Sequence, residues 1–243
     1  MTAMAQRISR RQALGALGTV SLGALLGACG DGDRKVATTD GGSATVEPKT
    51  SPASSLVEKL DAAGSCAQTA EQTEGPYYFD ADAVRSDIRE DRDGTVLELA
   101  LRVREADGCT PIENAIVDIW HCDAGGVYSG FADGEGERFL RGAQATNADG
   151  IARFKTIYPG HYQGRTVHIH VKVHAGGQEV HTGQLYFDDA ISNTVYTQQP
   201  YAQHTGRDTT NTTDSIFGQG GQRSLLTLTQ AAGGYTGRQT LVV

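Results

Sequence analysis

The chain has 243 residues, with 21 Lys and Arg against 29 Asp and Glu, and a formal net charge of −8. An acidic chain argues against nucleic-acid binding, which depends on neutralising phosphates with Lys and Arg, and against a polybasic membrane-binding patch. The roughly 180 residues that follow residue 64 are enough for one domain with its own core.

The N-terminus has the features of an export signal. Ser9-Arg10-Arg11 precedes an uncharged run, Ala13–Ala28, that is mostly Ala, Gly and Leu and too short for a membrane-spanning helix. The run ends at Leu26-Gly-Ala-Cys29, which resembles a bacterial lipoprotein box. We therefore expect a twin-arginine-type lipoprotein signal peptide at residues 1–28. The mature protein would be exported and anchored by a lipid on Cys29, facing the periplasm or the cell exterior, with no other membrane contact. A secreted protein without a lipid is the alternative.

Residues 29–64 form a segment of different composition. They are rich in Asp, Gly, Ser, Thr, Ala and Pro, and contain few large apolar residues. Such a segment cannot bury enough apolar surface to offset the entropy lost on ordering. We expect it to act as a flexible tether between the lipid and a folded domain at residues 65–243.

The domain is predicted to be all-β. The run from Val96 to Val103 alternates, with Leu97, Leu99, Leu101 and Val103 on one face, which is typical of a strand with one buried face. Turn signals such as Asp107-Gly108 separate it from further candidates. These are Ala115–Trp120, Ile151–Ile157, Val167–Val173, Gly183–Phe187, Leu225–Leu228 and Thr240–Val243. The pattern predicts a β-sandwich core of mostly antiparallel strands. Residues 188–223 contain no strand pattern, so we expect them to form a long loop. Because long loops in compact domains are usually functional, we expect active-site loops there.

Three cysteines remain once Cys29 is set aside: Cys66, Cys109 and Cys122. Disulfides persist in exported proteins. Cys109 and Cys122 flank a predicted strand and would lie ~40 Å apart if extended, whereas a disulfide needs Cα atoms within about 7 Å. Cys66 should therefore pair with one of them. We favour Cys66–Cys122, because both precede segments expected at the site, while Cys66–Cys109 stays open.

Two histidines in Val167–Val173 are candidate metal ligands. His168 and His170 share a strand face, with Cα atoms ~6.6 Å apart, so their imidazoles can meet at one ion. His174 is on the same face but lies about 13 Å beyond His170, too far for that ion. The alternative is that both histidines are polar residues on a solvated face.

Two tyrosines complete the candidate set. Tyr128 follows Trp120-His121-Cys122-Asp123, and Tyr162 follows a Pro-Gly turn. A phenol has a pKa of about 10, so two phenolates at neutral pH require a strongly Lewis-acidic ion. Zinc prefers Cys, His and carboxylates, and Mg²⁺ and Ca²⁺ prefer carboxylates and carbonyls. Two phenolates with two imidazoles suit Fe(III), which could also bind a dianionic catecholate. Each tyrosine taken alone could instead be a packed or rim residue.

These residues stand in motifs that resemble the intradiol ring-cleavage dioxygenases, which include protocatechuate 3,4-dioxygenase and catechol 1,2-dioxygenase. The motifs are Thr73-Glu-Gly-Pro-Tyr-Tyr78, Asn114 to Gly130, Asp149-Gly150, Tyr158-Pro-Gly-His-Tyr162, Arg165-x-x-His168-Ile-His170 and Gly183-Gln-Leu-Tyr-Phe187. The likeness covers roughly residues 66–190 and fills all four ligand positions in order. The exported pattern and the tether indicate a separate branch, in which the residues that select the substrate cannot be transferred.

The resemblance implies a non-haem Fe(III) enzyme that cleaves catechol-type rings between the hydroxylated carbons with O2, giving muconate-type diacids. It implies four metal ligands, Tyr128 and His168 in the equatorial plane and Tyr162 and His170 on the axis, with Tyr162 leaving as substrate binds and taking its proton. Arg165 would stabilise charge on the ring, and Gln184 would lie near the substrate. Tyr77 and Tyr78 would join them in substrate binding. The resemblance thus implies a site made of Tyr77, Tyr78, Tyr128, Tyr162, Arg165, His168, His170 and Gln184.

The resemblance leaves other points open. No partner chain is required, and a homodimer is possible, although the helical dimerisation region of catechol 1,2-dioxygenases is replaced by the tether. His121 and His161 have no assigned role. We expect His161 to be an exposed turn residue, and the alternative is a group beside Tyr162 that supports a ligand or handles a proton.

A rival class shares part of the pattern. Pro111 to Val117, Thr146 to Phe154 and Tyr158 to Tyr162 also resemble non-catalytic carboxypeptidase-regulatory or transthyretin-like β-sandwiches. Such modules bind at surfaces, and likeness of fold does not establish chemistry. They lack Tyr128 combined with Arg165-x-x-His168-x-His170. A lipoprotein that stores or senses iron is a third possibility.

Overall fold

The computed structural model describes residues 34–37, 43–46, 60 and 66–243. The predicted signal peptide, Cys29 and most of the predicted tether lie outside this range. The described part of residues 29–64 includes an antiparallel pair, β1 (Arg34–Ala37) with β2 (Ser43–Val46). Within the described ranges, no helix combines the length and the apolar character needed to span a bilayer.

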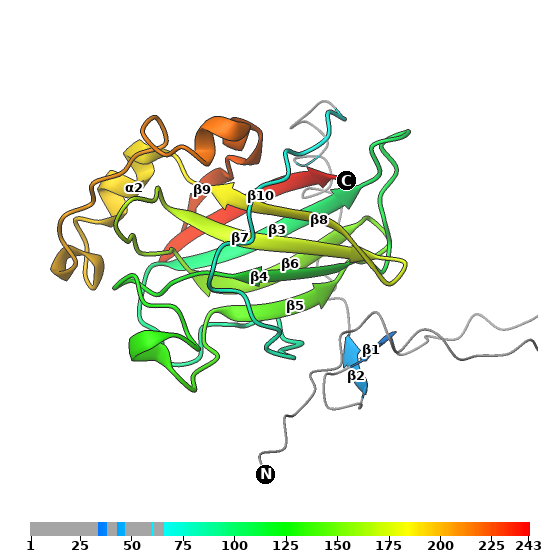
Figure 1. Cartoon of the computed structure of the whole chain (residues 1–243), viewed down its shortest axis with the longest axis horizontal. Helices are drawn as coiled ribbons and strands as arrows, with labels where there is room; N and C mark the ends of the chain where they lie inside the picture. The colour runs from blue at the N-terminus through cyan, green and yellow to red at the C-terminus, as the bar shows by residue number, and fades with distance from the viewer. Residues whose placement is uncertain (1–33, 38–42, 47–59, 61–65) are drawn as a thin grey trace, which may run out of the picture. The chain divides into compact units, whose positions relative to one another are not determined.

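Two four-stranded sheets form the domain (Figure 1). The first has the order β6-β3-β10-β9 and the second the order β5-β4-β7-β8. Their strands are β3 (Val96–Arg104), β4 (Ile116–Trp120), β5 (Arg141–Ala145), β6 (Ile151–Ile157), β7 (His168–Ala175), β8 (Gln178–Tyr186), β9 (Thr227–Ala231) and β10 (Gly234–Val242). Neighbouring strands are antiparallel except β10 and β3, which are parallel. The predicted all-β sandwich with mostly antiparallel strands is confirmed.

The core lies between the sheets and fixes the register of β7. Leu97, Leu99 and Leu101 of β3 belong to the same buried cluster as Ile169 and Val171 of β7. A slip of one residue in β7 would turn its apolar side chains out of the core and its histidines into it. Burial of the apolar face therefore decides that His168 and His170 point to the outer face of the second sheet.

The outer face of the second sheet is crossed by residues 66–84, which we call the strap. At one edge of the sheet the backbone N–H of Gln72 donates to Thr182 O of β8, at 2.9 Å. At the other edge the N–H of Ala143, in β5, donates to Ala83 O at 2.8 Å. The strap is the cyan trace that runs across the strands in Figure 1. It covers the side chains that a two-layer sandwich would otherwise leave exposed on this face.

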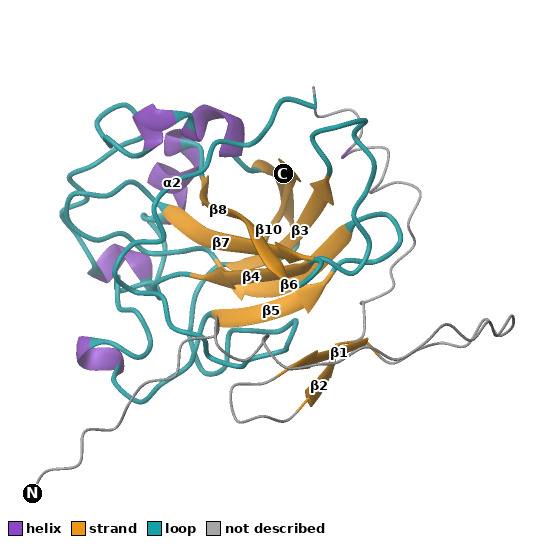
Figure 2. Ribbon diagram, turned by 45° about the vertical axis from the view of Figure 1, so that its right-hand side comes forward, coloured by secondary structure: helices purple, strands orange, loops and turns teal. Residues whose placement is uncertain are grey.

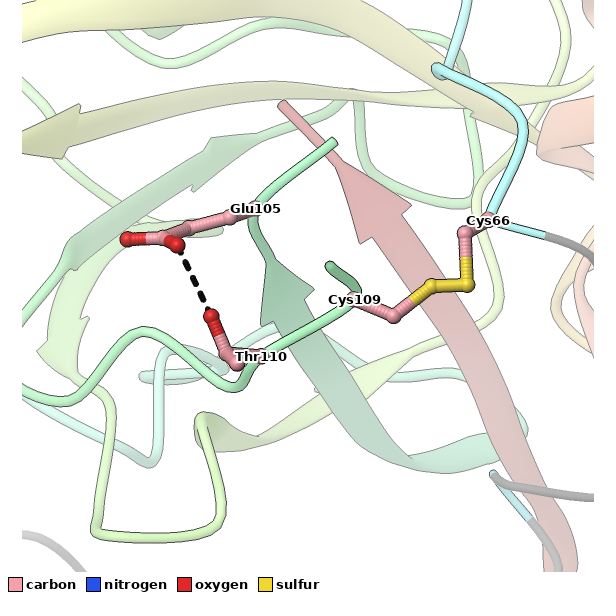
Figure 3. Close-up of a disulfide and its surroundings, with 4 residues drawn as sticks. All are labelled: Cys66, Glu105, Cys109 and Thr110. Atoms are coloured by element: carbon pink, nitrogen blue, oxygen red, sulfur yellow. Dashed lines mark hydrogen bonds between the residues drawn. A yellow bond between two sulfur atoms is a disulfide. The ribbon is translucent and has the colours of Figure 1, made fainter. Parts of the chain in front are cut away.

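A disulfide ties the beginning of the strap to the loop after β3. Cys66 pairs with Cys109, with Cα atoms 5.7 Å apart (Figure 3). Cys122 is a free, buried cysteine whose thiol lies 3.6 Å from Gly160 O. The favoured Cys66–Cys122 pairing is therefore wrong. Cys122 lies just beyond the end of β4, after His121, and packs in the interior with Trp120 and Tyr128, whereas Cys109 lies in the loop that the strap reaches.

Several elements differ from the sequence-based expectation. β8 begins at Gln178 rather than at the predicted Gly183, and β9 covers Thr227–Ala231 rather than Leu225–Leu228. β5 was not predicted, because Arg, Gly, Ala and Gln carry no strand pattern, and it forms by pairing with β4. β10 begins six residues before the predicted strand at Thr240, and pairs with the whole of β3. The loop at 188–223 contains α2 (Asp189–Val195), capped by Asp188, and short helical turns. Those turns are η3 (Tyr201–Gln203), η4 (Phe217–Gln219) and η5 (Gly221–Ser224), while η2 (Ala132–Gly134) lies in an earlier loop. Figure 2 shows α2 and the helical turns at one end of the sheets.

Candidate active site

The site is built on one row of side chains across the second sheet. The strand register places Arg141 of β5, Trp120 of β4, His170 of β7 and Gln184 of β8 directly beside one another. Directly opposite residues on neighbouring strands lie close enough for their side chains to touch. His170 is therefore flanked by Trp120 on one side and by Gln184 on the other.

The two histidines converge at their Nε2 atoms. These atoms lie 3.1 Å apart, and the side chains are 2% and 1% exposed, which rules out the solvated-face alternative. The Nδ1 of His168 lies 2.6 Å from Thr166 O, and since a carbonyl oxygen only accepts, this nitrogen carries the proton. Burial lowers the pKa of His168 to about 3. The ring is therefore neutral, and its Nε2 presents a lone pair to the site.

The two tyrosines meet at the same place. The Tyr162 hydroxyl lies 3.0 Å from His168 Nε2. The Tyr128 ring packs edge-on to Tyr162 at 5.7 Å, and its hydroxyl is buried without a hydrogen-bond partner in the part of the chain that the structure describes. Burial raises the pKa of both hydroxyls above the ordinary value. Both phenols stay protonated at neutral pH unless a cation joins them.

This arrangement fits a hard metal ion. Two phenol oxygens and two neutral imidazoles are gathered together, and an unpartnered buried hydroxyl is the polar atom that an ion would satisfy. Among the described residues, no group of three or more His, Cys, Asp or Glu side chains is placed to hold an ion. A zinc site made of Cys and His is therefore not found there. The donor set instead matches an ion acidic enough to deprotonate phenols.

Arg165 and Gln184 are brought together beside the ligands. The Arg165 guanidinium donates from one terminal nitrogen to Gln184 Oε1. Its Nε donates to Asp214 Oδ2 at 2.8 Å. Burial works to raise the pKa of Asp214, but the N–H groups of Phe217 and Thr166 and the Arg165 guanidinium outweigh it, so the pKa is lowered. A carboxylate thus holds the guanidinium in one orientation beside the site.

The two strap tyrosines have different surroundings. Tyr77 stacks on the Tyr128 ring, with centroids 4.4 Å apart and 15° between the planes, and lies edge-on to Tyr162. Tyr78 packs against Trp120 at 4.7 Å and donates to Asp118 Oδ2 at 3.4 Å, beneath the Lys172 ammonium. The structure therefore stacks Tyr77, rather than Tyr78, on a candidate ligand.

The two unassigned histidines are both buried. The Nδ1 of His121 lies 2.8 Å from Cys122 O and its Nε2 lies 2.7 Å from Thr156 Oγ1, which indicates a structural role. The expectation that His161 is exposed is wrong, because its side chain is 6% exposed. Its Nε2 donates to His204 O, and His204 Nε2 donates to His161 O in return. This exchange binds the loop that carries Tyr162 to the excursion after α2.

Sequence reasoning did not single out Asp214, Trp120 or Gly75, all of which border the site. Asp214 lies in the 188–223 loop, and the prediction that residues 188–223 form an active-site loop was the available signal for it. The Trp120 ring lies parallel to His170, with centroids 4.9 Å apart and 6° between the planes. Gly75 lies on the edge of the same imidazole. No local pattern signals either contact, because each depends on which segments meet.

Comparison with known proteins places these residues in a family context. A family model described as "Dioxygenase" (Dioxygenase_C) matches residues 73–208. A chlorocatechol 1,2-dioxygenase of Cupriavidus pinatubonensis is 34% identical over 137 residues, which is 47% of this chain and 53% of the relative. A catechol 1,2-dioxygenase of Acinetobacter lwoffii is 35% identical over 115 residues, which is 43% of this chain and 37% of the relative. The chain spans about half the length, or less, of these two curated relatives.

Solved structures give a longer match. An intradiol ring-cleavage dioxygenase from Tetranychus urticae is 38% identical with a TM-score of 0.70, covering 73% of this chain and 94% of that one. The dioxygenase domain of a dioxygenase carbohydrate-binding protein fusion from Streptomyces sp. SirexAA-E is 33% identical with a TM-score of 0.57. This match covers 73% of this chain and 98% of that one.

Proposed function

Because the chain belongs to the intradiol ring-cleavage dioxygenase family, we propose that it cleaves catechol-type rings between the two hydroxylated carbons. Both atoms of O2 would enter the product, a muconate-type diacid. The observation that carries the proposal is the convergence of the Tyr162 hydroxyl and His170 Nε2 on His168 Nε2, at 3.0 and 3.1 Å. The unpartnered hydroxyl of Tyr128 adds the fourth donor.

The metal we assign to this site is Fe(III), held by Tyr128, Tyr162, His168 and His170. Two phenolate oxygens offset most of the charge of a trivalent ion, and phenolates and imidazoles suit iron better than magnesium or zinc. Bound there, Fe(III) would supply the Lewis acidity that keeps a catechol deprotonated and draws electron density from its ring.

The residues of the chain would handle the substrate around that ion. Tyr162 is half-buried and lies nearer to solvent than Tyr128, so we assign to its oxygen the proton taken from a substrate hydroxyl. The Arg165 guanidinium, fixed by Asp214, would face negative charge that develops on the ring. Gln184 accepts from Arg165 and donates from Nε2 to Thr73 O at 3.0 Å, which leaves its amide in one orientation.

The non-catalytic sandwich alternative is not favoured. The matched family and the similar structures are dioxygenases by name. The surface-binding role predicted by that alternative also gives no reason to bury two imidazoles and a phenol together without carboxylates.

Purified protein loaded with Fe(III) provides the test. We expect a phenolate-to-iron absorption band in the visible range, uptake of one O2 per catechol, and a ring-opened diacid carrying two ¹⁸O atoms from ¹⁸O2. His170→Ala should lose both the band and the turnover. His174→Ala is the matched control, because it lies on the same strand beyond reach of the ion. Failure of the purified protein to bind Fe(III), or the absence of oxygen uptake with catechol, chlorocatechols and hydroxyquinol, would contradict the proposal.

We also propose that the domain works outside the cytoplasm, attached to a membrane by a lipid on Cys29. The sequence around Cys29 supports this, and a disulfide at Cys66–Cys109 suits an oxidising compartment. Expression in a bacterial host should place wild-type protein in the membrane fraction and Cys29→Ser in the soluble exported fraction. Recovery of both in the cytoplasm would contradict the assignment. The homodimer remains a prediction.

A further inference from the structure

The two candidate histidine ligands are held in different ways. His168 donates from Nδ1 to Thr166 O at 2.6 Å. The Nδ1 of His170 is buried and has no hydrogen-bond partner among the residues that the structure describes. Metal-binding histidines almost always donate their second N–H, and that bond sets the angle of the ring. His170 lacks this restraint, so another contact must orient it.

Packing on two sides supplies the restraint. The Trp120 ring lies against the face of His170, 4.9 Å between centroids and 6° from parallel. The strap meets the edge of the same ring at Gly75, where a Cβ atom would stand 3.2 Å from Cε1 and 3.8 Å from Nε2. Gly75 has φ +72°, a conformation that favours glycine. A side chain at residue 75 would thus meet the imidazole more tightly than a Cβ atom ordinarily meets its neighbours.

The strap is fixed at the two residues that directly precede Gly75. Glu74 forms an ion pair with Lys172, which lies two residues beyond His170 on β7 and also pairs with Glu179 at 3.1 Å. On the other side of Glu74, Thr73 O accepts from Gln184, the direct neighbour of His170 on β8. Lys172 lies on the strand that carries His170, and Gln184 lies on the strand beside it. The strap is therefore anchored to the same strands that position the imidazole.

We propose that Gly75 is a positioning residue that sets the orientation of the His170 imidazole in place of the missing Nδ1 hydrogen bond. The proposal rests on the proposed function, because it takes His170 to be a metal ligand. A methyl group at residue 75 would press on the Cε1 edge, next to the nitrogen that faces the ion. Either the ring would have to turn, which moves Nε2, or the strap would have to lift, which removes the contact that restrains the ring on that edge.

Gly75→Ala tests the proposal, with Gly177→Ala as the matched control. Gly177 has φ +78°, and a Cβ there would meet nothing within 4 Å, so its variant carries the same backbone strain without the contact. Binding of Ga(III) to iron-free protein is measured by calorimetry, since this ion has the charge of Fe(III) and no redox chemistry. We expect Gly75→Ala to bind Ga(III) about 10- to 100-fold more weakly, the range seen when an outer partner of a metal ligand is lost. The visible band of its Fe(III) form should also shift, while Gly177→Ala matches wild type in both. Equal affinity in the two variants, or an unshifted band, would overturn the role of Gly75.

A second pair of variants keeps the proposal testable if Gly75→Ala does not fold. Glu74→Gln weakens the anchor of the strap, whereas Glu179→Gln removes a carboxylate from the same lysine without touching the strap. We expect the first to weaken Ga(III) binding several-fold and the second to leave it unchanged. An equal loss of Ga(III) affinity in the two variants, or no loss in either, would contradict the role of the strap in positioning His170. Wild-type protein distinguishes the proposed function from the positioning role. If wild-type protein binds neither Fe(III) nor Ga(III), the proposed function is wrong. If it binds both ions and the variants bind them equally well, only the positioning role of Gly75 is wrong.

Discussion

The Arg165 guanidinium donates a hydrogen bond to the side-chain oxygen of Gln184, which pairs directly with His170 across β7 and β8. The same guanidinium is held by Asp214 from a loop 49 residues further along the chain. A fixed positive charge is therefore attached to the strand that flanks a candidate ligand. An orientation maintained by two partners needs no rearrangement when charge develops on a bound ring.

Replacing Arg165 should impair turnover without removing the metal. In Arg165→Met we expect kcat to fall on the order of 10²-fold, the loss typical of removing one preorganised donor. The visible band of the resting Fe(III) protein should be retained. Arg165→Lys keeps the charge but loses the planar fork that reaches both Asp214 and Gln184, so its rate should lie between those of Met and wild type. Loss of iron in the Met variant would show that Arg165 supports the ligands instead.

Replacing Tyr128 by phenylalanine should affect iron binding and fold stability in opposite directions. The hydroxyl is buried with no partner within the described residues, so its removal should leave the unfolding free energy of metal-free protein unchanged or raise it by about 1 kcal/mol. Tyr158→Phe is the contrast, because that buried hydroxyl hydrogen-bonds Ser192 Oγ at 2.7 Å. Its loss should lower stability by about 1 kcal/mol. Urea unfolding measures both variants, and only Tyr128→Phe should abolish Fe(III) binding. A clear loss of metal-free stability in Tyr128→Phe would mean that its hydroxyl is already satisfied.

The Cys66–Cys109 disulfide should stabilise the domain by restricting its unfolded chain. It closes a loop with a sequence separation of 43, for which the chain-entropy estimate is about 4 kcal/mol. Cys66→Ser/Cys109→Ser should therefore unfold at lower temperature, while Cys122→Ala should still contain the disulfide in mass spectra of the unreduced protein. A mixture of Cys66–Cys109 and Cys66–Cys122 peptides in wild-type protein would contradict the structure.

Stability should decrease between pH 6.5 and pH 4, in part because of His121. Burial lowers the pKa of His121 from 6.5 to about 4, so within that window the unfolded chain binds a proton that the folded chain does not. Unfolding is then favoured by up to about 1.4 kcal/mol per pH unit, which amounts to about 3 kcal/mol over the window. His121→Gln lacks this titration. The pH dependence of its urea unfolding should be shallower than that of wild type by up to one proton, and identical slopes would exclude the contribution of His121.

The strand at Val167–Val173 could be predicted from the sequence, because side chains along a strand alternate between two faces with a period of two. The positions of Tyr128, Tyr162, His168 and His170 could also be selected from residue chemistry and motif spacing, and the structure brings all four together. Asp214 could not be selected. It is one of several polar residues in a loop without periodicity, and its contact with Arg165 exists only after that loop has folded back over the sheet.

Strands without a local pattern were missed for a related reason. β5 contains Arg, Gly, Ala and Gln, which have little preference for extended backbone, and it becomes a strand because β4 and Ala83 offer it hydrogen bonds. The first half of β10 contains Gly234 and Gly237, and a side chain at Gly234 would collide with the backbone of Val96. Those glycines allow β10 to approach β3 closely. They also interrupt the alternation of apolar and polar residues by which a strand is predicted.

The sequence by itself determined the class of fold and the kinds of atoms available to a metal, because both follow from local periodicity and from side-chain chemistry. Only the tertiary structure decided that Cys66 pairs with Cys109, that Tyr77 rather than Tyr78 stacks on Tyr128, and that Gly75 touches His170. Each of these contacts joins segments distant in sequence. Their geometry depends on strand register and on the path of the strap across the sheet, which no short stretch of residues specifies.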